Sequence, residues 1–551
     1  MYLSRKLSSL VLVAALWTST ATSQKITFPL VWKSKSDNKT NFLTTCATDG
    51  GEVVATTKKQ ICVLNGSDGK IVWSGDLEKI AGMTDSDYQR YMEDAGVIFV
   101  FNKRRGADQM TCIDTKTGKA LWTSEKYEGV TGGNLIYLPE LSAFGIYLKE
   151  GMDMLDARTG KLKWSISRFS GAIAKSMYFT DTKELLLLNY RPVSLKSFFS
   201  GFKNQLMLLN AETGEVKWTT EYKGVVESKI VTKDPVVSWQ LAQGKDKILI
   251  ELDGLQVFDL KTGTSVWSED LNMSLDKGHL LFNSEVQVYN AIAEPLVNGN
   301  DVYIVEFSPK GHQKVLKKFD VNTGKLIWTN EEIDGRKTII PALVCVNGMV
   351  VAQIGGYVNR QSIEHNNGVI TSKSKWEWEG PFGLKAFDAE TGKMAWESEK
   401  FKGLVTNLLA DESNLYVASE ECFFKLNSKT GVPLYTIKHK AAKVGEPREL
   451  LAFNNKIAVL SQDGVCAYNT QDGTTAYTAQ IEDMKEEYYA YGGFYFLKSK
   501  TDLIGFDFNT GKTTGTFEFE RGELKWKLTK DGKFLYLFSK GEGDIAKYKT
   551  N

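Results

Sequence analysis

The residue types that carry most enzyme chemistry are few and widely spaced in this chain of 551 residues. Adjacent carboxylates such as Glu420-Glu421 would point to opposite faces of a strand, so we expect them in solvent. No nucleophile elbow, phosphate-binding loop or dinucleotide fingerprint occurs. The four histidines lack metal-ligand spacing and are expected on the surface or in loops with satisfied hydrogen bonds: His279, His312, His365 and His439. The sequence therefore predicts no catalytic residue, no metal ligand and no cofactor-binding residue.

One acidic or amide side chain does recur, at the start of a nine-residue phrase of the type Asp-x-x-Thr-Gly-Lys-x-x-Trp. Its side chain can accept hydrogen bonds from the backbone two residues further on, which starts a turn. The glycine supplies the left-handed position that closes a short hairpin loop. The recurring Asp therefore indicates a β-hairpin rather than catalysis. The copies are residues 65–73, 114–122, 156–164, 210–218, 259–267, 320–328 and 388–396, with weaker ones at 427–435, 469–477 and 507–515.

The tryptophan that ends each clear copy is expected to wedge between neighbouring sheets. A buried indole N–H needs a hydrogen-bond partner, and a turn carbonyl of the next repeat could supply it. In the weaker copies Tyr435, Tyr477 and Gly515 replace the tryptophan, so docking there should be looser or differently built. The expected docking residues are Trp73, Trp122, Trp164, Trp218, Trp267, Trp328 and Trp396.

The elements that must position these residues are short strands. Apolar segments between the copies supply two further strands per repeat, and the period of roughly 40 to 50 residues is typical of propeller blades. We therefore predict an all-β fold, a β-propeller of four-stranded antiparallel blades with about ten repeats. The tail adds strand-like segments at 524–528, 534–538 and 545–548, and residues 26–32 resemble a motif strand. A closing blade made from both termini is expected.

Residues 24–551 are expected to form the propeller. A single ring is favoured because no Pro/Gly/Ser linker separates two halves. The alternative is two smaller propellers, divided near the long spacings around Gly324 and Gly392.

The repeated phrase resembles the tryptophan-docking motif of PQQ-like β-propellers, the quinoprotein alcohol dehydrogenase-like superfamily. That group includes catalytic quinoprotein dehydrogenases and the outer-membrane assembly lipoprotein BamB. The resemblance covers nearly the whole chain after residue 23. Many of the dehydrogenases carry adjacent cysteines beside a quinone and a calcium ion, and this chain has no adjacent cysteines. The sequence is therefore more similar to BamB, and the resemblance implies a binding protein of the envelope.

Residues 1–23 read as a signal peptide, with Arg5 and Lys6 before a short apolar run and a small-x-small site before Gln24. No segment is apolar over the length of a membrane-spanning helix. The net charge of +1 gives no reason to expect nucleic acid as a partner. We expect a secreted protein, periplasmic or extracellular. The six scattered cysteines favour buried thiols over a disulfide framework, although their disulfide state stays open.

Insertions between strands are the best candidates for binding a partner, since binding residues often lie on loops held by a rigid scaffold. The largest spans residues 355–381, where Trp376 and Trp378 would share one face of a strand. A second, residues 190–201, carries Phe198 and Phe199. Both aromatic pairs could instead pack back onto the ring. A third segment, residues 83–94, is expected to form a short helix.

Together these patterns predict a monomeric, non-catalytic scaffold that binds a protein or polysaccharide through its blade loops. The resemblance to BamB implies a role in envelope protein assembly. The alternative is a dehydrogenase of alcohols or sugars that depends on PQQ and calcium.

Overall fold

The computed structural model describes most of the chain after residue 26. The described residues are 27–35, 44–47, 51–102, 108–127, 130, 132–148, 151–167, 169, 172–190, 203–224, 238–241, 246–252, 254–271, 279–280, 286–289, 291–307, 314–333, 338–366, 369–481, 484, 488–491, 494–498, 502–518, 525–529, 531–538 and 543–550. The expected signal peptide lies outside them.

Within these residues, 46 strands form eleven antiparallel sheets, each the core of one blade. Blade 1 is β2 (Thr44–Ala47), β3 (Glu52–Thr56), β4 (Gln60–Asn65) and β5 (Ile71–Asp76); blade 2 is β6 (Tyr88–Met92), β7 (Val97–Asn102), β8 (Gln109–Asp114) and β9 (Ala120–Ser124); blade 3 is β10 (Leu135–Leu138), β11 (Ala143–Leu148), β12 (Gly151–Asp156) and β13 (Leu162–Ile166); blade 4 is β14 (Ala172–Phe179), β15 (Glu184–Tyr190), β16 (Gln205–Asn210) and β17 (Val216–Glu221).

The next four blades continue in the same order. Blade 5 is β18 (Ser238–Leu241), β19 (Lys247–Glu251), β20 (Leu255–Asp259) and β21 (Ser265–Glu269); blade 6 is β24 (Leu296–Asn298), β25 (Asp301–Phe307), β26 (Lys314–Asp320) and β27 (Leu326–Asn330); blade 7 is β28 (Ala342–Val346), β29 (Met349–Asn366), β30 (Val369–Asp388) and β31 (Met394–Glu397), extended by β22 (His279–Leu280) and β23 (Val286–Tyr289); blade 8 is β32 (Leu409–Ala410), β33 (Asn414–Ala418), β34 (Phe423–Asn427) and β35 (Pro433–Ile437).

The last three blades bring the two ends of the described chain together. Blade 9 is β36 (Pro447–Phe453), β37 (Lys456–Ser461), β38 (Gly464–Asn469) and β39 (Thr475–Gln480); blade 10 is β40 (Tyr488–Tyr491), β41 (Phe494–Lys498), β42 (Asp502–Asp507) and β43 (Lys512–Glu518); blade 11 is β44 (Lys525–Leu528), β45 (Phe534–Phe538), β46 (Asp544–Lys549) and β1 (Leu30–Lys35). Helices are short: α1 (Leu77–Ala81), η1 (Glu93–Ala95), η2 (Gly132–Asn134), η3 (Pro139–Leu141) and η4 (His439–Ala442).

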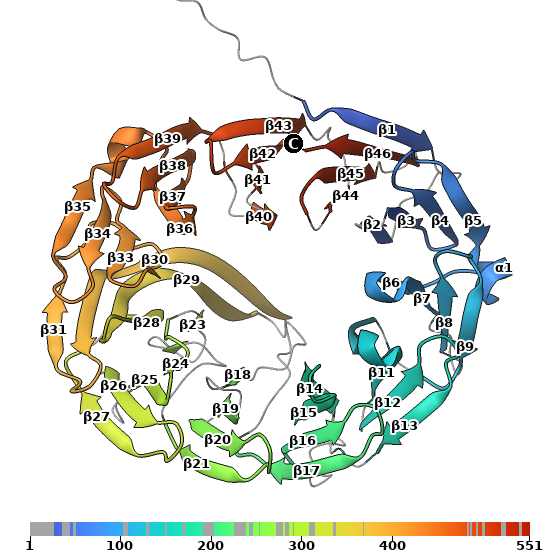
Figure 1. Ribbon diagram of the computed structural model, residues 1–551, viewed down its shortest axis with the longest axis horizontal. Coiled ribbons are helices and arrows are strands. Elements are labelled where there is room, and N and C mark those ends of the chain that lie inside the picture. Colours follow the sequence, from blue (N-terminus) through green and yellow to red (C-terminus); the bar gives the residue numbers. More distant parts are fainter. Residues whose placement is uncertain are drawn as a thin grey trace, which may run out of the picture.

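The blades follow one another around a ring, with the first strand of each blade nearest the middle and the fourth on the outside (Figure 1). Eleven blades exceed the usual four to eight. The predicted all-β propeller, with about ten repeats and a closing blade from both termini, is confirmed. None of the helices in the described part of the chain has the length and apolarity that a membrane crossing requires.

The cores of the molecule lie between neighbouring blades, because the two middle strands of a blade bury both faces. All six residues of β7 are buried, for example, whereas β9 at the rim is half-exposed. Phe99 of blade 2 packs edge-to-face on Phe144 of blade 3, with ring centroids 4.9 Å apart. A single blade cannot bury both faces, so each one depends on its neighbours.

The ring closes through the N-terminal segment. Strand β1 pairs antiparallel with β46, and Phe28 just before it is buried among Leu503, Leu528 and Leu535 of blades 10 and 11. A Cβ at Gly515 would overlap the Phe28 ring, so the glycine that replaces tryptophan in the last copy makes room for this phenylalanine. One short segment thus joins blades 10 and 11 to blade 1.

The helix expected over residues 83–94 is wrong. Residues 88–92 form β6, the inner strand of blade 2, and the helix α1 lies earlier in the chain. The pairing of β6 with β7 decides the outcome, since every β6 residue has a partner in that strand.

The unequal spacing of the repeats also has a structural origin. The longest separations, around Gly324 and Gly392, contain β22 and β23 and the long strands β29 and β30. They are insertions into the ring.

Candidate functional site

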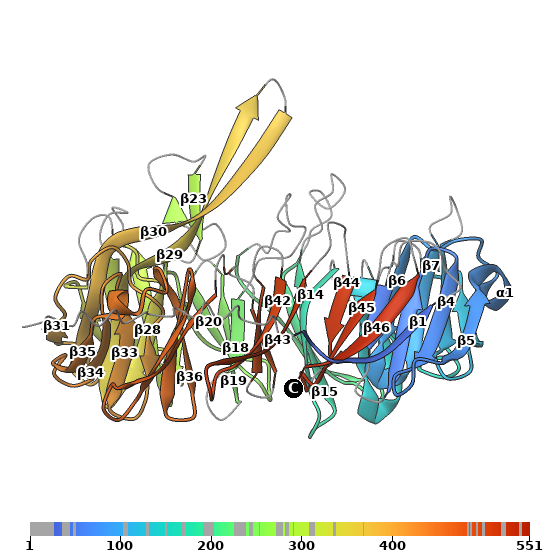
Figure 2. The ribbon, with the colours of Figure 1, turned by 90° about the horizontal axis from the view of Figure 1, so that it is seen from above.

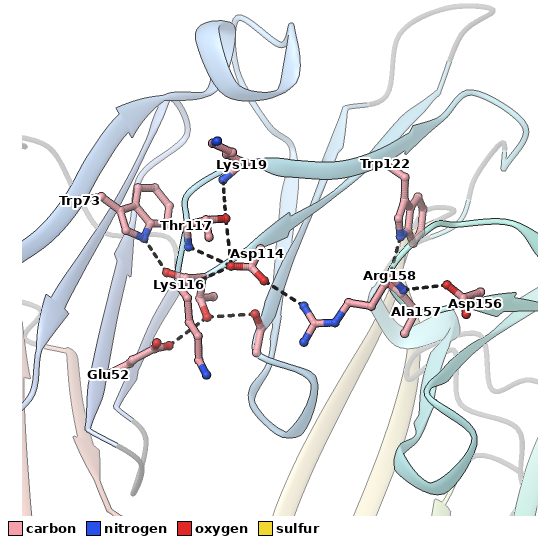
Figure 3. Close-up of polar contacts among 12 residues, drawn as sticks. Glu52, Trp73, Asp114, Lys116, Thr117, Lys119, Trp122, Asp156, Ala157 and Arg158 are labelled. Carbon is pink, nitrogen blue, oxygen red and sulfur yellow. Dashed lines mark hydrogen bonds and ion pairs between the residues drawn. The ribbon is translucent and has the colours of Figure 1, made fainter.

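The turn that opens each repeat is built by its acidic or amide residue. Asp114 Oδ1 accepts hydrogen bonds from the backbone N–H groups of Lys116 and Thr117 at 3.0 and 2.9 Å and from the Thr117 hydroxyl (Figure 3). Arg158 of the next blade binds the other carboxylate oxygen at 2.9 Å. Burial would raise the pKa of Asp114, but the Thr117 hydrogen bonds and the Arg158 charge hold it below its usual value. These contacts account for the Asp as a structural residue.

The tryptophan of each clear copy lies on the turn of the following blade. Trp73 donates its indole N–H to the carbonyl of Thr115, and Trp122 donates to Ala157 (Figure 3). Each indole covers the next turn glycine so closely that a Cβ there would overlap the ring. The same bond, at 2.5–3.1 Å, is made by Trp32, Trp73, Trp122, Trp164, Trp218, Trp267, Trp328 and Trp396.

Trp32 belongs to this set although it lies outside the repeated phrase. It sits in β1, donates to the carbonyl of Gly66 at 3.0 Å and covers Gly69 of blade 1. The signal in the sequence was the apolar stretch that ends in this residue, which resembles a motif strand without its turn.

The two tyrosine copies dock differently. The Tyr435 hydroxyl reaches the carbonyl of Asn469 at 3.4 Å, longer than any of the indole bonds. The Tyr477 hydroxyl is buried without a hydrogen-bond partner among the described residues. The tyrosine ring still packs on the turn glycine, but its hydroxyl does not form the short hydrogen bond that the indole N–H forms.

The most prominent departure from the ring is a hairpin formed by the outer halves of β29 and β30. It rises from blade 7 and stands above the face of the ring (Figure 2). The hairpin leaves the blade at a bulge, where the register shifts between Ile354 and Gly356. Gly355 has φ +78°, and a Cβ there would overlap the carbonyl oxygen of Pro381, so only glycine fits.

The hairpin has one face toward the ring and one face away from it. Val358 is fully buried in the cluster between blades 6 and 7, and its cross-strand partner is Glu377. Successive residues of a strand point to opposite sides. The neighbouring pair Tyr357 and Trp378 therefore lies on the face away from the ring, together with Trp376.

Three aromatic rings meet on that outer face. Tyr357 stacks on Trp376 with ring centroids 5.3 Å apart, and its ring is tilted by 47° to that of Trp378 with centroids 4.8 Å apart. Trp376 keeps 43% of its surface exposed. We define these three residues as the aromatic face. Trp376 and Trp378 contact Tyr357 on this outer face and do not pack back onto the ring, which was the alternative for this pair.

Tyr357 was missed in the sequence although a signal for it exists. The Asn367-Gly368 pair is a strong hairpin signal, and counting outward from it places Tyr357 opposite Trp378. The other predicted pair, Phe198 and Phe199, lies outside the described residues.

The remaining chemistry-bearing residues are explained by local structure. Both ring nitrogens of buried His439 lie within hydrogen-bond distance of hydroxyls, Tyr468 at 2.9 Å and Ser461 at 3.0 Å, and burial lowers its pKa to about 4. Asp153 is buried but accepts hydrogen bonds from Lys126, Tyr127 and Ser165. Each of these buried groups has partners that satisfy it.

A quinone with calcium, as in the catalytic members of the superfamily, would need a set of acidic or other metal ligands. In the part of the chain that the structure describes, no three His, Cys, Asp or Glu side chains come together as a metal site. The free thiols found there, Cys112, Cys345, Cys422 and Cys466, are scattered over different blades.

Glu251 is the exception among the buried charges. It is 3% exposed, and its Oε2 has no hydrogen-bond partner among the described residues. Burial, with a smaller contribution from Glu294, raises its pKa to about 8, while Lys175 opposes the shift. The three residues come from blade 4, blade 5 and the segment before blade 6, and no local sequence pattern indicates that they interact.

We expect Glu251→Gln to stabilise the protein at alkaline pH. The unfolded carboxyl ionises near 4.5 and the folded one near 8. Stability that depends on the protonated form is complete below pH 4.5 and is lost as the pH rises through 8. Thermal denaturation at pH 9 should show the variant more stable by at least about 1 kcal/mol. At pH 4 the two proteins should unfold together, and a constant difference at all pH values would contradict the assignment.

Comparison with known proteins agrees with this architecture. The family described as "Outer membrane protein assembly factor BamB" matches residues 27–269 and 382–515. Nearly all of the protruding hairpin lies in the unmatched stretch between them. No curated protein matches the chain in sequence.

Several solved structures are similar to this chain at low sequence identity. BamB from Moraxella catarrhalis is 17% identical, with 80% of this chain and 98% of that chain covered and a TM-score of 0.29. A europium-containing methanol dehydrogenase is 12% identical, with 68% and 81% covered and a TM-score of 0.31. The computationally designed Ika8 protein is 12% identical, with 82% and 99% covered and a TM-score of 0.30. Likenesses this distant do not bear on function.

The family match spans more than half of the chain, and it includes nine of the ten repeated turns. The docking tryptophans, the turn glycines and the four-stranded blades are the features on which such repeats depend. The chain therefore belongs to the BamB family of PQQ-like β-propeller repeat proteins.

Proposed function

We propose that this protein is a non-catalytic scaffold of the cell envelope or the extracellular space that captures a protein partner on its aromatic face. The observation that carries the proposal is the contact of the Tyr357 ring with Trp376 and Trp378 on the side of the hairpin away from the ring. Aromatic rings dominate binding interfaces because they bury a large area at low entropic cost. The base of this hairpin packs into the core between blades 6 and 7 through Val358.

The family supports a partner of this kind. Its described function is assembly of outer membrane proteins, which is a task of binding rather than of bond chemistry. A polymer such as a polysaccharide could also stack on indole rings. The description of the family, as an assembly factor for outer membrane proteins, favours a polypeptide.

The test is partner capture by crosslinking in the native cell. Trp376→Ala combined with Trp378→Ala should reduce the captured partner by at least about tenfold, as expected for aromatic hot spots. A matched control is Met394→Ala, which truncates an exposed apolar side chain of β31, away from the hairpin. Undiminished capture by a folded double variant would contradict the assignment of the aromatic face.

A second measurement addresses catalysis. Dye-linked dehydrogenase activity that appears with added quinone and calcium, and disappears on chelation, would contradict the non-catalytic proposal.

A further inference from the structure

The hairpin has an outer backbone edge that no described strand covers. The sheet runs in the order β22-β23-β29-β30-β31, and β31 pairs with β30 only at residues 385–387. Residues 369–381 of β30 therefore form an edge within the described chain, since the next carbonyl, that of Phe382, accepts a hydrogen bond from the N–H of Phe401; this part stands above the ring (Figure 2). An edge strand is a template for pairing with another strand.

The charges along this edge have an unusual order. Lys373, Lys375, Glu377 and Glu379 occupy alternate register positions of β30, and Trp376 and Trp378 occupy positions between them. Lys375 contacts Glu377 at 2.8 Å within the strand and keeps 75% of its side chain exposed. An antiparallel strand of the same sequence presents these four charges in the reverse order. Two positive positions followed by two negative ones therefore face opposite charges on such a strand.

We propose that β30 pairs antiparallel with β30 of a second copy, about a two-fold axis at Trp376. In this register Lys375 lies opposite Glu377 of the second copy, and Lys373 lies opposite Glu379 of the second copy. The two-fold symmetry repeats both pairs, so four opposite-charge pairs form at one self-complementary interface. The partner that this edge fits is another molecule of the same protein.

Other registers are disfavoured. A shift of the second copy by one residue would turn its side chains to the opposite face of the sheet. The alternative registers to compare are therefore those shifted by two residues. A two-fold axis at Lys375 places this lysine against its own copy, and an axis at Glu377 places two glutamates together. Among the registers that pair these four charged residues with one another, only the axis at Trp376 avoids like charges. Pro381 lacks a backbone N–H and would end the ladder beyond Glu379.

The pairing would also change the aromatic face. Trp376, which is 43% exposed in one chain, would lie beside its own copy, and the two aromatic faces would form one continuous surface. This inference departs from the monomer expected from the sequence. It concerns the edge of the hairpin and stands whether or not the aromatic face binds a partner.

The experiment measures the mass of the full chain in solution by sedimentation. The wild type should associate reversibly to twice the mass of one chain. The variant K373E/K375E makes the edge wholly acidic, and the variant E377K/E379K makes it wholly basic. Each variant alone should remain monomeric at concentrations where the wild type is dimeric.

Mixing provides the decisive control against misfolding. An equimolar mixture of the two variants should form a one-to-one dimer, and the fourfold variant that exchanges both pairs should dimerise by itself. A monomeric wild type, dimers of either variant alone, or a mixture that stays monomeric would each overturn the proposal. If the charge variants lose the dimer but retain partner capture in the native cell, the two proposals are separated.

Discussion

Removal of residues 24–34 should destabilise the whole ring. The deletion eliminates most of β1 and two buried rings, Phe28 in the core of blades 10 and 11 and Trp32 on the blade 1 turn. Truncation of one such ring costs about 3–5 kcal/mol. Loss of both should therefore exceed about 6 kcal/mol, and the edge of β46 becomes exposed. Denaturant unfolding of the deleted and full chains measures the difference.

The same segment supplies its own control. Leu30 and Val31 are 55% and 45% exposed, between the two buried rings. Their replacement by threonine should leave the unfolding midpoint nearly unchanged, whereas Phe28→Ala with Trp32→Ala should reproduce most of the deletion. Equal effects of the two pairs would show that closure does not depend on these rings.

Truncation of a docking tryptophan is the second large effect that we expect. Trp396 is 8% exposed, donates to the carbonyl of Ser428 at 2.9 Å and covers Gly431. Trp396→Ala should lower the free energy of unfolding by about 3–5 kcal/mol. Tyr477→Phe is the contrasting change, because its hydroxyl has no partner among the described residues. Its removal should be neutral or slightly stabilising.

A double-mutant cycle tests whether the indole and the glycine act as one unit. A Cβ at Gly431 would overlap the Trp396 ring, so Gly431→Ala should be strongly destabilising in the wild type. In the Trp396→Ala background only the left-handed backbone, at φ +68°, remains unfavourable, and the added cost should fall to about 1 kcal/mol. Additive effects would contradict direct docking.

The ring could be predicted because its determinants are local. The turn needs one side chain such as Asp114 and one glycine four residues later, and both are visible in any single copy. The glycines sit at positive φ in all ten repeats, as turn closure requires. The closing blade was also predictable, because a motif strand without its turn stood at one end and three strands without a motif strand stood at the other.

The site was only partly predictable, since it depends on contacts between distant segments. The pairing of β23 with β29 joins residues some 70 positions apart, and no local pattern specifies it. The outer face of the hairpin follows from the burial of Val358, which a sequence does not reveal. Residues 83–94 were misread for a related reason: a polar, aromatic segment became a strand because β7 was there to pair with it.

The docking contact has a direction, since eight blades present an indole to the turn of the following blade, and Tyr435 and Tyr477 take the same place in two others. The indole contact has the same partners at these eight junctions, a turn carbonyl and a turn glycine, so a duplicated repeat can join its neighbours without a new kind of contact. Such a ring can then gain whole blades during evolution, provided that the angle between neighbouring blades becomes slightly smaller at every junction. A ring of eleven is the outcome expected of such growth, and the terminal strand, rather than any repeat, fixes where the growth stops.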